Sequence, residues 1–250
     1  MTSFYVECVE LLDVNLMEAI RQAGQSNKVF DAKDSLFFKF QGSPSSIKET
    51  STLVKRIVKK HGSTQFNFAR NREEAEELWN HRKMALWSVM EWVDDPNARI
   101  WTTDVCVPPS RLPQLVAETK RDIDQQGITS CVLGHVGDGN WFLQELDPPY
   151  NAPIGNFHAL LAFKSDEELE TVQEAVHRLI HRAIALDGTC TGEHGVGVGK
   201  REYLEEELGS GTVELMKRIK RTVDPLNLFN PGKASGCISL YCIYADFRVL

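Results

Sequence analysis

Five of the thirteen residues from Gly188 to Lys200 are glycine, in the order Gly-Thr-Cys-Thr-Gly-Glu-His-Gly-Val-Gly-Val-Gly-Lys. Glycine adopts backbone conformations closed to other residues and lets a chain approach a bound group closely. The run therefore predicts a tightly turned loop, and it places a carboxylate, Glu193, next to an imidazole, His194. A flexible surface loop is the alternative interpretation.

Two phosphate-binding patterns do not fit this run. A phosphate-binding loop requires glycine, four residues and then Gly-Lys-Ser/Thr, but His194 stands five positions before Gly199 and Arg201 follows Lys200. A dinucleotide fingerprint follows a strand, whereas the residues before Gly188 have the period of a long helix. The loop is therefore not predicted to bind a nucleotide phosphate by either pattern.

Composition narrows the class of protein. The 250 residues carry a net charge of -7, which argues against a nucleic-acid partner, since such proteins concentrate lysine and arginine. The six cysteines form no CxxC pair, which fits reduced thiols in an intracellular compartment and disfavours a zinc ribbon. The sequence has no run of eighteen apolar residues and no secretion or transit signal, so we expect no transmembrane or targeting segment.

Short strands alternate with amphipathic helices along the chain. Expected strands cover residues 4–12, 36–40, 65–69, 100–107, 130–133 and 157–163, and expected helices cover 14–23, 44–60, 72–93, 112–126, 166–186, 201–208 and 212–223. Tight connections and alternating polarity in the strands favour an α+β fold, with an antiparallel sheet and helices on one face. The first strand has no lead-in, which indicates a truncated start.

Arg82 and a histidine pair stand out on two of these helices. Arg82 falls within the apolar sector of the helix over 72–93, where an arginine either extends to the rim or meets a buried anion such as a substrate carboxylate. His177 and His181 are four residues apart, as metal ligands can be, but they point away from the apolar stripe of their helix. We expect these two histidines to be solvated.

A group of four polar residues lies at expected strand ends and in glycine-rich turns. It comprises His135, His158, Glu193 and His194. Two histidines and one glutamate are a ligand set that leaves Zn²⁺ or a similar ion an open position for a substrate oxygen, and His194 could then act as a base. This set suits removal of a proton from a metal-bound hydroxyl, with Arg82 fixing a neighbouring carboxylate. A structural histidine at position 135 is the alternative.

Four ordered motifs carry a resemblance to a known family. They are Thr-Asp-Val-Cys-Val-Pro at 103–108, Gly-His-Val-Gly-Asp-Gly-Asn at 134–140, Gly-Thr-Cys-Thr-Gly-Glu-His-Gly-Val-Gly at 188–197 and Asn-Pro-Gly-Lys at 230–233. At these residues the chain resembles the C-terminal half of the FAD-linked D-lactate dehydrogenases of the mitochondrial, cytochrome c-reducing type. The resemblance covers roughly residues 4 to 233.

This resemblance implies an arrangement of domains. Residues 1–187 would form the ferredoxin-like cap or substrate domain, residues 188–233 would form the catalytic glycine-rich loop and a C-terminal helical segment, and residues 234–250 would be an atypical tail. The family's N-terminal FAD-binding domain would be absent. We therefore expect this chain alone to bind FAD poorly and to turn over slowly or not at all.

The resemblance also implies site residues and an activity. His135, His158 and Glu193 would bind the divalent metal, His194 would take the hydroxyl proton, Arg82 would hold the substrate carboxylate and Asn230 would approach the flavin. The full-length mitochondrial parent would oxidise D-lactate to pyruvate by hydride transfer to FAD and pass electrons to cytochrome c. D-2-hydroxyglutarate dehydrogenase and the glycolate oxidase flavin subunit share these elements, and a non-catalytic cap domain is a further alternative.

The sequence departs from the family pattern between the two histidines. In the family the motif at 134–140 continues directly into Phe-His, and deleting residues 141–156 restores that continuation with Phe157 and His158. We therefore treat 141–156 as an insertion. Retained intron sequence is a hypothesis for both this insertion and the tail after Lys233.

Overall fold

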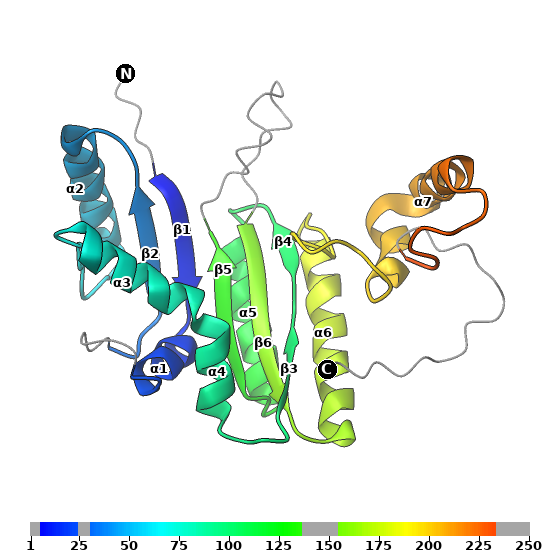
Figure 1. Ribbon diagram of the computed structural model, residues 1–250, viewed down its shortest axis with the longest axis horizontal. Coiled ribbons are helices and arrows are strands. Elements are labelled where there is room, and N and C mark those ends of the chain that lie inside the picture. The colour runs from blue at the N-terminus through cyan, green and yellow to red at the C-terminus, as the bar shows by residue number, and fades with distance from the viewer. Residues whose placement is uncertain (1–5, 25–30, 137–154, 234–250) are drawn as a thin grey trace. The chain divides into compact units, whose positions relative to one another are not determined.

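The computed structural model describes residues 6–24, 31–136 and 155–233, and it forms two compact units, residues 1–193 and 194–250 (Figure 1). The first unit contains a sheet and its helices. Its strands are β1 (Val6–Leu12), β2 (Ser35–Phe40), β3 (Arg99–Thr102), β4 (Val105–Val107), β5 (Ser130–His135) and β6 (Gly155–Phe163). Its helices are α1 (Val14–Gln22), α2 (Pro44–Lys60), α3 (Arg72–Lys83), α4 (Ala85–Val93), α5 (Leu112–Gln125) and α6 (Asp166–Ala185).

The strands form one sheet in the order β2-β1-β5-β6-β3, and β4 also pairs with β6. Every pairing between these strands is antiparallel, which confirms the predicted α+β class. Strands β5 and β6 pair with Leu133 opposite His158 and His135 opposite Asn156. Because side chains alternate between the faces of a strand, these four residues share one face of the sheet.

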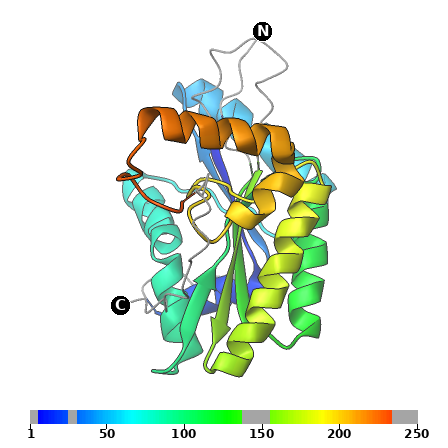
Figure 2. The same ribbon diagram turned by 90° about the vertical axis from the view of Figure 1, so that its right-hand side faces the viewer.

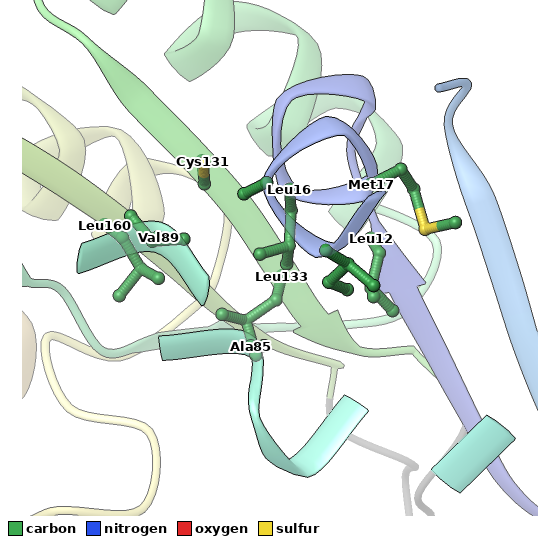
Figure 3. Close-up of a cluster of buried hydrophobic side chains, with 10 residues drawn as sticks. Leu12, Leu16, Met17, Ala85, Val89, Cys131, Leu133 and Leu160 are labelled. Atoms are coloured by element: carbon green, nitrogen blue, oxygen red, sulfur yellow. The ribbon is translucent and has the colours of Figure 1, made fainter. Parts of the chain in front are cut away.

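The same face carries a hydrophobic core over β1, β5 and β6 (Figure 3). Leu12 and Leu16 come from β1 and α1, Ala85 and Val89 from α4, and Leu160 from β6, and all are buried. Asp13 caps the start of α1, because its carboxylate accepts a hydrogen bond from the Leu16 amide at 2.9 Å and so satisfies one free donor of the first turn. The core fixes α1 and α4 against the sheet.

Helices lie on both faces of the sheet, which corrects the expectation of helices on one face (Figure 2). A Cβ built on Gly155 would lie 2.8 Å from the Leu112 side chain, so α5 packs on the face opposite the α1 and α4 core. Phe157 and Leu161 point to this second face and are buried. The physical reason is the nearly continuous apolar run from residue 157 to 163, because a strand covered on both sides needs apolar residues at successive positions.

Three local predictions differ from the structure. Residues 65–69 form no strand, since they are mostly exposed and pair with none of the described strands. The expected helix over 72–93 is broken at Met84 into α3 and α4, so that Ala85 and Val89 can join the core. The expected strand over 100–107 is interrupted by Thr103 and Asp104, whose side chains form hydrogen bonds to other segments.

The second unit contains a 3₁₀ helix, η2 (Arg201–Tyr203), followed by α7 (Leu204–Val223). Gly209 has φ 77° and ψ 153°, which is not helical and kinks α7. Glycine adopts a positive φ with little strain, so the chain can kink at this position. The kink falls between the two short helices predicted at 201–208 and 212–223. Within the described ranges, no helix has the length and apolar character needed to cross a membrane.

Candidate metal centre

The sheet register brings two histidines together. His135 is the last residue of β5, and His158 lies one diagonal step away on β6 because its direct partner is Leu133. The two ring centroids are 6.0 Å apart with the rings nearly perpendicular, at 85°. His158 is 5% exposed, whereas the His135 side chain is 23% exposed. The pair therefore has one buried member and one that is partly exposed to solvent.

The Nδ1 atom of each ring has a partner within hydrogen-bonding distance. His158 Nδ1 lies 2.7 Å from the Thr103 backbone oxygen. A carbonyl oxygen can only accept, so His158 carries a proton on Nδ1. His135 Nδ1 lies 3.0 Å from Glu10 Oε1, which is also an acceptor when ionised. In both rings the Nε2 atom therefore remains to contact something else.

Glu193 reaches both Nε2 atoms from the glycine-rich loop. Its Oε1 atom lies 3.3 Å from His158 Nε2 and 3.9 Å from His135 Nε2. The three ligand atoms lie within 4.8 Å of one another. The Glu193 side chain is 51% exposed, so this group is open on one side. Two imidazole nitrogens and one carboxylate oxygen with an open side match the donor set of a catalytic zinc site.

A buried aspartate holds the Glu193 backbone in place. The Asp104 carboxylate accepts hydrogen bonds from the Gly192 amide at 3.0 Å, from the Glu193 amide at 3.1 Å and from the Thr191 hydroxyl at 3.2 Å. A Cβ built on Gly192 would lie 2.3 Å from Asp104 Oδ1, so only glycine fits at this position. The loop also bridges to β4, where Cys106 pairs with Thr189.

The arrangement of donors and acceptors favours a positive charge between His158 and Glu193. With its proton on Nδ1, a neutral His158 directs the Nε2 lone pair toward the Glu193 carboxylate, and two acceptors at 3.3 Å repel each other. A proton on Nε2 or a cation between the groups removes this repulsion. The fixed tautomers thus fit a divalent ion, because metal-binding histidines commonly donate their other N–H to a carbonyl or a carboxylate.

Arg82 extends from α3 to the same face of the sheet. Its Nε and Nη2 atoms each lie 2.8 Å from Glu10 Oε2. Burial raises the pKa of Glu10, but the hydrogen bond from His135 and the charge of Arg82 outweigh it, and the net pKa is lowered. Glu10 is therefore ionised at neutral pH. The structure places Arg82 against a buried anion, and that anion is a carboxylate of the protein.

His194, Asn230 and the two histidines of α6 complete the set of residues singled out in the sequence. His194 is the first residue of the second unit and directly follows Glu193. Asn230 is in the same unit, with φ 47°, in a turn where its backbone oxygen accepts a hydrogen bond from the Lys233 amide. His177 and His181 face each other on α6, with 2.9 Å between their Nε2 atoms, and they are not part of the group formed by His135, His158 and Glu193.

Most of the predicted insertion, residues 141–154, lies outside the described residues, as does the tail over 234–250. Its last two residues, Gly155 and Asn156, belong to β6 and pair with Val107 and Cys106. Asn156 also lies opposite His135. These two residues are thus part of the strand that carries His158.

Sequence reasoning assigned no role to Thr103, Asp104 or Glu10. Thr103 and Asp104 interrupt an apolar strand segment, and two adjacent polar residues at such a place are a signal that could have identified them. Glu10 has the same parity as Leu12, which points to the core. An acidic residue at an inward position of a strand is rare unless it is paired.

Comparison with known proteins identifies the family of this chain. The family model for FAD linked oxidases, C-terminal domain, matches residues 2–234. A mitochondrial D-lactate dehydrogenase [cytochrome] 1 of Saccharomyces cerevisiae is 39% identical over 236 residues, which are 93% of this chain and 38% of that protein. Glycolate oxidase subunit GlcD of Bacillus subtilis is 31% identical over 229 residues, 90% of this chain and 44% of that protein. The chain thus spans less than half of each of these relatives.

A solved structure supports the fold. The 4-ethylphenol oxidase of Gulosibacter chungangensis superposes with a TM-score of 0.64 at 16% identity, over 92% of this chain and 47% of that one. The predicted resemblance is confirmed by the family match and by the identity to the yeast protein. The chain belongs to the family of FAD linked oxidases and comprises their C-terminal domain.

Proposed function

We propose that this chain is the substrate domain of a flavin-linked dehydrogenase that acts on small D-2-hydroxy acids, with D-lactate the first candidate, and that His135, His158 and Glu193 hold one divalent cation. The convergence of three ligand atoms within 4.8 Å is the observation that carries the proposal. The names of the relatives support the substrate class, since they are a D-lactate dehydrogenase and a subunit of a glycolate oxidase.

The proposed chemistry divides between the bound groups and the residues of this chain. A divalent cation in this position would lower the pKa of a substrate hydroxyl, and FAD, held mainly outside this chain, would accept the hydride. His194 would take the hydroxyl proton as the general base. Arg82 would hold the substrate carboxylate, and Asn230 would approach the flavin ring.

The proposal extends to the partners of the whole protein. The name of the yeast relative includes cytochrome and a mitochondrial location. By that relationship, cytochrome c would accept the electrons and the protein containing this chain would be mitochondrial. Glycolate is the alternative substrate favoured by the match to the Bacillus subtilis subunit.

The metal site is tested by thermal unfolding of the chain with and without Zn²⁺. A ligand at about 100 times its Kd stabilises the folded state by about 2.7 kcal/mol. Glu193 is half exposed, so Glu193→Gln should leave the metal-free fold intact and abolish the stabilisation. Glu174→Gln, at an exposed position on α6, is the matched control and should respond to Zn²⁺ like the wild type.

Zinc bound to the histidine pair of α6 would also stabilise the protein, so each protein is also measured with His177→Ala and His181→Ala. These substitutions remove two imidazoles that lie outside the proposed site. A stabilisation that survives Glu193→Gln but disappears with the α6 histidines would reject the proposed metal site. A stabilisation that disappears with Glu193→Gln but survives removal of the α6 histidines would support it.

The substrate class is tested in a chimera. The C-terminal segment of the yeast relative is replaced by this chain, and reduction of the flavin is followed with D-lactate, glycolate and D-2-hydroxyglutarate. We expect D-lactate to reduce the flavin fastest and Glu193→Gln in the chimera to slow the reduction at least 100-fold. Faster reduction by either of the other acids would reassign the substrate.

A further inference from the structure

We propose that Glu10 is a positioning residue that holds His135 in the tautomer required for metal binding and is itself held by Arg82. The inference rests on the proposed metal site. It assigns a function to a carboxylate that neither the sequence motifs nor the comparisons identify. Glu10 lies on β1, directly opposite His135 on β5, so the sheet register determines the contact.

The two oxygens of Glu10 have different partners. Oε1 lies 3.0 Å from His135 Nδ1, and the Cys8 thiol donates to the same oxygen at 3.5 Å. Oε2 accepts from Nε and Nη2 of Arg82, each at 2.8 Å. The carboxylate therefore cannot rotate to a new pairing without losing a charge-assisted hydrogen bond. One oxygen anchors the group and the other orients the imidazole.

Burial explains why this contact is strong enough to select a tautomer. Glu10 is 5% exposed and the Arg82 side chain 17% exposed, so water competes poorly for either oxygen. A buried carboxylate requires hydrogen-bond donors, and His135 supplies one only with its proton on Nδ1. With the proton there, the Nε2 lone pair faces Glu193, as metal coordination requires.

The contact with Glu10 also fixes the orientation of the Arg82 guanidinium. Two of its N–H edges are directed at Glu10, and Nη1 is the remaining nitrogen. A substrate carboxylate would then meet a guanidinium whose direction is already fixed by Glu10. Glu10 would thus set the separation between the metal ligand His135 and the carboxylate-binding Arg82.

The inference is tested with Glu10→Gln. Two properties are measured: the affinity for Zn²⁺, by competition with a chromophoric chelator, and the ring tautomer of His135 in the metal-free protein, by ¹⁵N NMR. Loss of a residue that hydrogen-bonds to a metal ligand weakens metal binding by about 10- to 100-fold. We expect that loss, together with a shift of His135 from the Nδ1–H form toward a mixture of both tautomers.

Glu7→Gln is the matched control. Glu7 lies on the same strand and pairs with Lys39 at 2.6 Å on an exposed surface. Its removal should leave both the Zn²⁺ affinity and the His135 tautomer unchanged. If Glu10→Gln unfolds the protein because Arg82 is left unpaired, the double variant Glu10→Gln with Arg82→Gln removes both charges, and the same two measurements are made on it.

The outcomes separate this inference from the proposed function. An unchanged His135 tautomer in Glu10→Gln overturns the inference, whether or not the wild type binds zinc. A shifted tautomer with an unchanged Zn²⁺ affinity also overturns it, because orientation would then not matter for binding. A wild type that binds no zinc rejects the proposed metal site, and the tautomer measurement then decides alone whether Glu10 orients His135.

Discussion

Replacement of Gly192 by alanine is the sharpest test of how the glycine-rich loop positions Glu193. A Cβ at this position would lie 2.3 Å from Asp104 Oδ1 and 2.6 Å from Asn156 Oδ1. Carbon and oxygen atoms rarely approach within 3.0 Å, so the loop must move by about 1 Å. The amides of Gly192 and Glu193, now 3.0 and 3.1 Å from Asp104, would then lie beyond hydrogen-bonding distance.

The free-energy change follows from these contacts. Overpacking of a filled site costs about 1–3 kcal/mol, and loss of a hydrogen bond to a charged group costs about 1.5–3 kcal/mol. The two costs are not fully additive, because the loop movement that relieves the steric overlap is the same movement that breaks the hydrogen bonds. We therefore expect Gly192→Ala to lower the free energy of unfolding by about 2–4 kcal/mol.

The assay is urea unfolding followed by circular dichroism, with Zn²⁺ affinity measured alongside. A metal site tolerates ligand displacements of only about 0.2 Å, so the same 1 Å movement should weaken Zn²⁺ binding at least 10-fold. Gly199→Ala is the control, because a Cβ there would meet no atom within 4 Å. If both variants unfold at the same urea concentration and bind Zn²⁺ equally, the loop does not position Glu193 as described.

Two further predictions concern the first unit away from the metal centre. Burial raises the pKa of Asp122, but hydrogen bonds from Arg178 and Arg182 lower it more, so the net pKa lies below the ordinary 3.8. The ionised carboxylate therefore stabilises the fold above its ordinary pKa, and this stabilisation is lost on acidification. The free energy of unfolding of the wild type should exceed that of Asp122→Asn by about 1–2 kcal/mol at pH 7, and the difference should disappear below about pH 4. Urea unfolding at each pH measures both values. Burial raises the pKa of the Cys131 thiol, whereas Cys8 is half-buried. A maleimide should therefore label Cys8 before Cys131 in the folded protein, as peptide mass spectrometry would show, and equal labelling of these two cysteines would contradict the described burial.

The sequence was sufficient to predict most elements, because helix periodicity and end signals are local. Helix α2 over 44–60 matches its prediction, since Ser43, Pro44 and the glycine at 62 mark its ends. The sequence also proposes His135, His158 and Glu193 as metal ligands, and in the structure their potential ligand atoms lie within 4.8 Å of one another. That prediction depends on family motifs more than on spacing, because Glu193 lies 58 positions after His135.

Contacts between distant segments could not be read from local patterns. Nothing near Glu10 in the sequence indicates Arg82, which lies 72 residues away. The break at Met84 was missed for a related reason, since 72–93 is periodic enough for one helix and only packing against α1 divides it. The helices on the second face of the sheet could not be predicted, because an apolar run such as 157–163 shows that a strand is buried but not which element packs against it.

The diagonal placement of His135 and His158 makes the proposed metal site depend on the alignment of β5 and β6. A slip of β6 by one residue against β5 would send the His158 ring to the face covered by α5, where it could not meet Glu193. Cation binding would then favour the correctly aligned sheet over its shifted competitors.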